Sequence, residues 1–236
     1  MRNPIILALD VPDLESARKL IRELAPVVGA FKVGKELFVA TGPELVREIR
    51  ATGASVFLDL KFHDIPNTVA KAVASAVRLD VQMLTVHTSG GHEMLAAAEQ
   101  AAQQTALQSG REAPLVLGVT VLTSMDNDNL AEIGVSANIG QQVERLAMLA
   151  ARSGLRGLVC SPLEIAALRQ IIPAKMQLVT PGIRPGGGGG DGDDQKRTLS
   201  PREAMEAGAS WLVIGRPIYQ AANPRKAAEE ILATLG

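Results

Sequence analysis

Three ionisable side chains that could perform acid–base chemistry lie close together in the sequence: Asp59, Lys61 and Asp64. Asp59 lies within a short apolar run, 56–60, that contains no breaker and predicts a buried strand, and Lys61 directly follows it. Because strand side chains alternate between faces, this carboxylate and this ammonium should project from the same face. Charges at the end of a buried strand are costly, so the pattern fits a structural ion pair, side chains that point outward to solvent, or a catalytic group.

Strands and helices alternate along the whole chain. Apolar runs predict strands at 5–9, 30–34, in the first half of 55–68, and at 81–87, 115–122, 158–160, 177–180 and 211–214. Helical periodicity predicts helices at 14–24, 43–51, 69–79, 94–107, 139–153, 162–172, 201–207 and 224–235. Unbroken apolar strands are typical of parallel sheets buried on both faces. This α/β pattern favours a single-domain (β/α)8 TIM barrel over 1–236, with an open doubly wound sheet as the alternative.

Composition restricts the class of protein. The 236 residues are 47% hydrophobic, 21% charged and only 3% aromatic, which predicts an aliphatic core within one domain. A net charge of −1 argues against a nucleic-acid or membrane-surface binder. Cys160 is the single cysteine, which excludes an internal disulfide, and its apolar surroundings favour a buried role. No apolar run is long enough to span a membrane, so we expect a soluble, cytoplasmic protein.

Polar and charged residues recur where the predicted strands end, which in such barrels is the face that carries the active site. These residues are Asp10, Lys32, Asp59 with Lys61, His87, Thr123 with Ser124, Arg184 and Arg216. Fold stability alone would not require so many charges at one face. The pattern therefore predicts a pocket for a small anionic ligand.

Two features indicate that this anion is a phosphate. Gly215 and Arg216 follow the eighth strand, where barrels often hold a phosphate; the glycine allows close backbone approach and the arginine offers a planar fork. The loop 184–197 contains a run of five glycines and fits either a flexible surface loop or a lid over the active site. The histidines lack the spacing of metal ligands, and neither a dinucleotide fingerprint nor a P-loop is present. We therefore expect no metal and no cofactor.

Several motifs, in this order, resemble the orotidine 5′-phosphate decarboxylase family in its shorter bacterial form. The most specific motif is the decapeptide DLKFHDIPNT at 59–68; the others are LALD at 7–10, FKVG at 31–34, LTS at 122–124, TPGIR at 180–184 and GRPI at 215–218. The resemblance covers essentially the whole chain. It implies a (β/α)8 barrel that acts as a cofactor-independent homodimer and converts orotidine 5′-phosphate to UMP and carbon dioxide, the last step of pyrimidine nucleotide synthesis.

The resemblance also implies a role for each matching residue. Lys61 would protonate C6 of the pyrimidine, and Asp59 would lie beside the departing carboxylate. Lys32 and Asp64 would complete an alternating charge network, with Asp64 and Thr68 donated across the dimer interface. The remaining expected substrate contacts are Asp10 and Lys32 at the ribose, Thr123 and Ser124 at the pyrimidine, Gln195, Gly215 and Arg216 at the phosphate, Arg184 nearby, and Ile65.

Two alternatives remain open at this stage. A related Mg²⁺-dependent decarboxylase of 3-keto-sugar phosphates shares the Asp-x-Lys-x-x-Asp pattern but carries a metal-binding acid where Lys32 stands here. A barrel that binds a phosphorylated ligand without catalysis would share the phosphate site but not the reaction.

Overall fold

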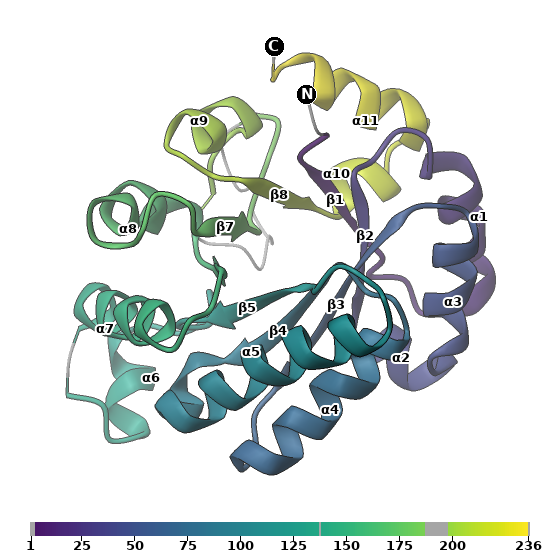
Figure 1. Cartoon of the computed structure of the whole chain (residues 1–236). Coiled ribbons are helices and arrows are strands. Elements are labelled where there is room, and N and C mark those ends of the chain that lie inside the picture. Colours follow the sequence, from purple (N-terminus) through teal and green to yellow (C-terminus); the bar gives the residue numbers. More distant parts are fainter. Residues whose placement is uncertain (1–2, 137, 187–197, 236) are drawn as a thin grey trace.

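A computed structural model describes residues 3–136, 138–186 and 198–235. Within them, eight parallel strands pair in sequence order and close into a barrel, β8 beside β1 (Figure 1). The strands are β1 (Ile5–Ala8), β2 (Ala30–Gly34), β3 (Ser55–Phe62), β4 (Met83–His87), β5 (Leu115–Val119), β6 (Gly157–Val159), β7 (Gln177–Thr180) and β8 (Trp211–Ile214). The expected (β/α)8 barrel is confirmed, and the open sheet is excluded.

Helices surround the strands (Figure 1). They are α1 (Leu14–Leu24), α2 (Lys35–Thr41), α3 (Glu44–Ala51), α4 (Pro66–Arg78), α5 (Gly91–Gln108), α6 (Asn127–Glu132), α7 (Ile139–Arg152), α8 (Ile165–Ile171), α9 (Pro201–Glu206), α10 (Arg216–Tyr219) and α11 (Pro224–Ala233). Two short 3₁₀ helices, η1 (Thr88–Gly90) and η2 (Pro162–Glu164), precede α5 and α8. Among the described helices, none is both long and apolar enough to cross a bilayer. A cytoplasmic location stays a prediction.

The sequence analysis missed three short α-helices and predicted one strand too long. Between β2 and β3 the chain forms two helices, α2 and α3, because Gly42 with φ +66° ends the first helix before the second begins. The short helices α6 and α10 had too few residues to show a period, although Asp126 and Asn129 form a capping box at the start of α6. Strand β5 ends at Val119 rather than at 122.

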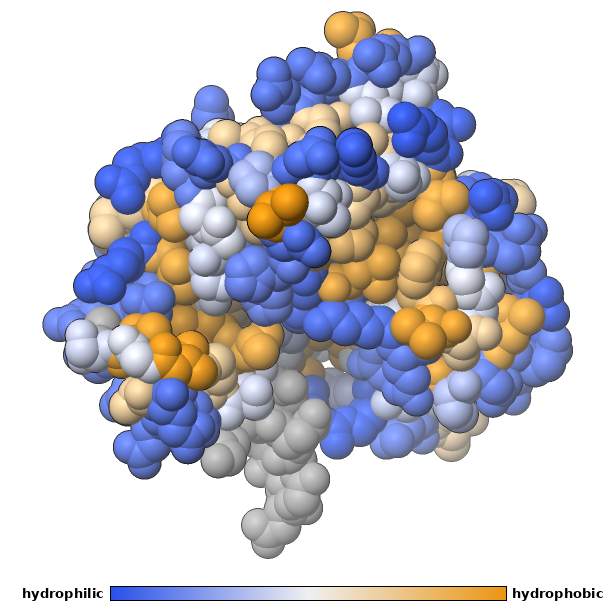
Figure 2. Space-filling model, turned by 90° about the horizontal axis from the view of Figure 1, so that it is seen from below, coloured by the Kyte–Doolittle hydropathy of each residue, from blue (hydrophilic) through white to orange (hydrophobic). Residues whose placement is uncertain are grey.

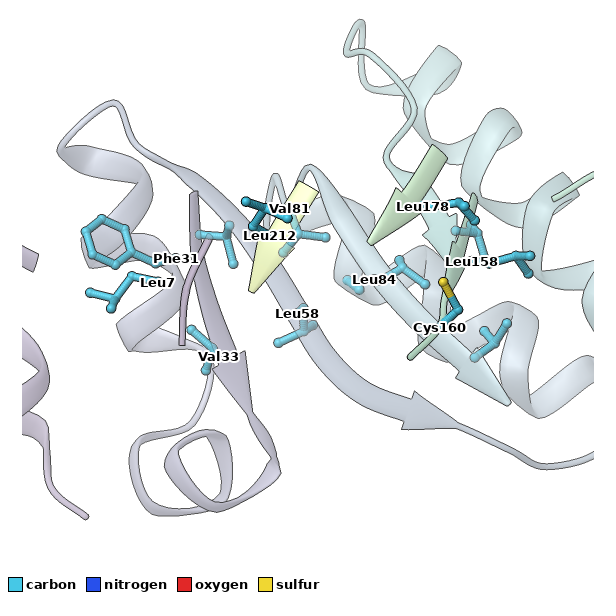
Figure 3. Packing of buried hydrophobic residues seen from close by; sticks show 14 of the residues in the cluster. Leu7, Phe31, Val33, Leu58, Val81, Leu84, Leu158, Cys160, Leu178 and Leu212 are labelled. Atoms are coloured by element: carbon cyan, nitrogen blue, oxygen red, sulfur yellow. The ribbon is translucent and has the colours of Figure 1, made fainter. Parts of the chain in front are cut away.

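The core forms two layers, because successive strand residues face opposite sides of the barrel wall. Inside the barrel lies an apolar cluster that includes Ile6, Phe57, Met83 and Trp211. The larger layer fills the space between the strands and the helices; Figure 3 shows some of its side chains, among them Leu58 and Leu84. Fully burying each such side chain is worth about 1.5–3 kcal/mol, so this double layer rigidly fixes the strand ends.

Candidate active site

A cavity of about 470 Å³ opens at the carboxyl-terminal ends of the strands. Eight of the residues predicted from the sequence line it: Asp10, Lys32, Asp59, Lys61, Thr123, Arg184, Gly215 and Arg216. They follow or end strands β1, β2, β3, β5, β7 and β8, which are far apart in the sequence. Closure of the barrel brings these strand ends to one mouth and so places two acids and four bases in one cavity.

The charged side chains pair inside this cavity. The Lys61 Nζ donates to both carboxylate oxygens of Asp59, at 2.8 and 2.9 Å, and the Lys32 Nζ donates to Asp10 Oδ1 at 2.8 Å. Burial would raise the pKa of Asp59, but the ammonium groups of Lys61 and Lys32 outweigh it and lower that pKa below its ordinary value of 3.8. Asp59 is therefore a carboxylate at neutral pH, beside an ammonium that it holds in place.

Lys61 reaches this position through an irregular backbone. Its φ is +52°, a left-handed conformation that residues with a side chain rarely adopt. The pairing of β3 with β4 shifts in register between Leu58 and Phe62, so Lys61 lies within the irregular part of the strand. Its backbone N–H donates instead to the Thr85 hydroxyl at 2.9 Å. Both Asp59 and Lys61 line the cavity, as period-two alternation predicts, but the strand between them is not regular.

Gly215 and Arg216 follow β8, the last strand of the barrel. A Cβ atom on Gly215 would lie 3.3 Å from the Tyr219 ring and 3.5 Å from the Ala8 Cβ, so a larger residue would crowd the cavity wall. Arg184, which follows β7, contributes a second guanidinium to the same cavity. Two guanidinium groups and a close backbone approach form an arrangement suited to phosphate oxygens.

An apolar wall, which the sequence analysis did not single out, completes the cavity. Its members are Val119, Val121, Leu122, Val159, Cys160 and Val213. Burial raises the pKa of the Cys160 thiol to about 12, with a further contribution from the Glu164 charge, so the thiol stays protonated. Alternation at the ends of β5, β6 and β8 could have identified this wall. A smaller adjoining cavity also includes Lys35, which follows β2 and was likewise missed.

Five predicted residues are not placed in this cavity. Asp64, Ile65 and Thr68 are exposed at the start of α4, and Ser124 is exposed in the loop after β5. Gln195 lies outside the described residues, as does most of the predicted lid, 187–197. Ile65 in particular leaves 66% of its surface exposed, which is high for an isoleucine.

The rings of two histidines, His63 and His87, lie close together and tilted to one another. The rings of His63 and His87 are 5.5 Å apart at their centres. Burial, then the neighbouring charge of His63, lowers the pKa of His87 to about 4, so it is neutral at physiological pH. Among the residues that the structure describes, no group of three or more His, Cys, Asp or Glu side chains is arranged to hold a metal ion.

The fold and this cavity define a class: a (β/α)8 barrel with a pocket for a small phosphorylated ligand at the carboxyl ends of its strands. Comparison with known proteins gives the family. The chain belongs to the orotidine 5′-phosphate decarboxylase / HUMPS family, whose model matches residues 3–231.

Relatives and solved structures agree with this family. Orotidine 5′-phosphate decarboxylase from Opitutus terrae is 52% identical over 231 residues, which cover 98% of this chain and 97% of the relative. The enzyme of the same name from Moorella thermoacetica is 49% identical over 235 residues, 99% of this chain and 92% of the relative. The crystal structure of orotidine 5′-phosphate decarboxylase from Lactobacillus acidophilus is similar with a TM-score of 0.88 at 36% identity, covering 99% of both chains.

Proposed function

We propose that this chain decarboxylates orotidine 5′-phosphate to UMP and carbon dioxide, with Lys61 as the proton donor. One observation carries the proposal: an ammonium held at 2.8 Å by a carboxylate lies in the same cavity as Arg184 and Arg216. In the reaction the bond from C6 to the carboxylate breaks and its electron pair stays on C6. The Lys61 Nζ then gives a proton to that carbon, and the lysine is reprotonated from solvent.

The arrangement of charges explains how the barrier is lowered. The carbon that loses carbon dioxide has no good resonance sink for its charge, so the reaction in water is very slow. An ammonium aimed at that carbon stabilises a charge that exists only in the transition state. Asp59 holds this ammonium in place. It also lies beside the substrate carboxylate, and the repulsion between the two carboxylates destabilises the ground state.

Binding of the remote parts of the substrate supplies the energy that positions the reacting carbon. Arg216 and the Gly215 backbone hold the phosphate, with Arg184 beside them. Asp10 and Lys32 hold the ribose hydroxyls, and Thr123 and Ser124 contact the pyrimidine. The lid and the role of Gln195 stay predictions.

The active enzyme is a homodimer that shares its sites. Support comes from Asp64, Ile65 and Thr68, which are exposed at the start of α4 and do not line their own protomer's cavity. Figure 2, which looks at the molecule from below, shows hydrophobic side chains exposed among hydrophilic ones on one face. The exposed Ile65 and Asp64 are suited to contact a partner protomer. Asp64 then enters the partner's pocket and joins its charge network of Lys32, Asp59 and Lys61.

The test is the ultraviolet absorbance of orotidine 5′-phosphate during incubation with the purified protein, with product analysis for UMP. We expect conversion both with and without EDTA. Activity on a 3-keto-sugar phosphate that EDTA abolishes would favour the Mg²⁺-dependent alternative, against which Lys32 argues. Binding of UMP with unchanged absorbance of orotidine 5′-phosphate would favour a non-catalytic barrel.

A further inference from the structure

The hydroxyl of Thr85 is hydrogen-bonded to two residues of β3, Asp59 and Lys61. Thr85 is in the middle of β4 and is fully buried. Its Oγ1 accepts a hydrogen bond from the Lys61 backbone N–H at 2.9 Å and donates one to Asp59 Oδ1 at 3.0 Å. A hydroxyl can donate one hydrogen bond, and here it donates to the Asp59 carboxylate. The Lys61 backbone N–H must therefore donate to a lone pair of the hydroxyl oxygen. The direction of both hydrogen bonds is fixed.

These bonds close a ring. Asp59 Oδ1, which accepts from Thr85, also accepts from the Lys61 Nζ at 2.8 Å. The ring thus runs from the Lys61 ammonium to the carboxylate, through the hydroxyl, and back to the Lys61 backbone. Hydrogen bonds in such a chain polarise and strengthen one another at a site of low dielectric constant.

The Lys61 backbone depends on this hydroxyl. Lys61 has φ +52° and lies where the β3–β4 pairing changes register. A part-buried N–H at such a place needs another acceptor, since an unpaired one is costly. Thr85 supplies that acceptor from the neighbouring strand, and so stabilises the left-handed conformation from which the lysine side chain enters the cavity.

Two other buried threonines of the barrel make no comparable contact. Thr88, three residues further on, is also fully buried, yet its hydroxyl has no hydrogen-bond partner among the described residues. Within the part of the chain that the structure describes, the Thr180 hydroxyl at the end of β7 has one hydrogen-bond partner, the Cys160 sulfur at 3.9 Å. Thr85 does not line the cavity, so it is placed to act through Asp59 and Lys61 and not on the substrate.

We propose that Thr85 is a positioning residue for catalysis: its hydroxyl aligns the Asp59 carboxylate and the Lys61 backbone so that the ammonium is aimed at the reacting carbon. This inference rests on the proposed role of Lys61 as proton donor. Misplacement of a catalytic group by about 1 Å can cost about 100-fold in rate.

The experiment compares Thr85→Val, which keeps the shape and removes the hydroxyl, with Thr85→Ser, which keeps the hydroxyl. The matched control is Thr88→Val, the same change at a buried threonine that has no such contact. We measure kcat, KM and the thermal midpoint of each variant. Thr85→Val should lose kcat about 10- to 100-fold with KM within about threefold, while Thr85→Ser and the control stay near wild type.

A kcat of Thr85→Val equal to that of the control would overturn the inference, as would a loss in Thr85→Ser as large as in Thr85→Val. Should Thr85→Val fail to fold, Thr85→Ala, which adds no methyl group to the site, takes its place with the same expected outcomes. Lys61→Met separates the two hypotheses. If it is inactive while Thr85→Val is normal, only the role of Thr85 fails; if Lys61→Met is active, the proposed function of Lys61 fails.

Discussion

Replacing Lys61 by Met removes the ammonium and keeps most of the side-chain volume. At 2.8 Å, with an effective dielectric constant of about 20, the attraction between Lys61 and Asp59 amounts to about 6 kcal/mol before desolvation is subtracted. Desolvation of both partly buried charges offsets much of this. Lys32 and Thr85 still stabilise the Asp59 carboxylate, so we expect a net loss of about 1–3 kcal/mol in the free energy of unfolding. For a chain of this size that lowers the thermal midpoint by about 2–12 °C.

The stability difference should depend on pH. In the wild type the lowered pKa of Asp59 adds stability above the ordinary value of 3.8, and this is lost as the pH falls through the folded-state pKa. In Lys61→Met one of the positive charges that offset the burial of Asp59 is missing. The pKa of Asp59 therefore rises, and keeping this carboxylate charged at neutral pH becomes costly. The gap between the two proteins should be widest near pH 7 and narrow as the pH approaches 4.

Activity should fall far more than stability. Loss of a general acid costs about 10²- to 10⁴-fold, and loss of a preorganised charge about 10²- to 10³-fold. If the two multiply, kcat falls at least about 10⁴-fold. The absorbance assay gives kcat, and thermal denaturation at pH 7 and pH 4.5 gives the stability gap. Lys175→Met, an exposed lysine just before β7 and away from the cavity, is the matched control. A folded Lys61→Met with kcat within tenfold of wild type would refute the reasoning.

Three further perturbations test other parts of the site. Arg216→Ala removes charge-assisted hydrogen bonds to the phosphate worth about 1.5–3 kcal/mol, so KM should rise about 10- to 150-fold. An unchanged KM excludes Arg216 from the phosphate site. The control is Arg145→Ala, on the exposed face of α7. Inactive Asp59→Asn and Asp64→Asn chains, when mixed and allowed to exchange subunits, should regain activity because one site of each heterodimer is intact; no recovery despite proven exchange contradicts sharing. Cys160, 2% exposed and with its pKa raised to about 12, should react with iodoacetamide at pH 8 far more slowly in the native protein than in guanidinium chloride, and equal rates would contradict its burial.

Much of the barrel could be predicted from local patterns. The eight apolar runs identified all eight strands that the structure describes, because parallel strands buried on both faces are continuously apolar. Short elements were missed: α6 and α10 are six and four residues long, less than two turns, so no period could appear. Strand β5 was predicted too long because the apolar residues Val121 and Leu122 belong to the cavity wall and not to the sheet.

The sequence by itself determined the order of strands, the charged residues at their ends, and the placement of Asp59 and Lys61 on one face, since these depend on residue types at short spacing. Only the tertiary structure decided how Lys61 is held. Its left-handed backbone and the register shift beside it could not be read from period-two alternation. Thr85 is 24 residues away and reaches Lys61 only because β4 packs beside β3 at one register. Hydrogen bonds between strands depend on that three-dimensional register, which no local spacing contains.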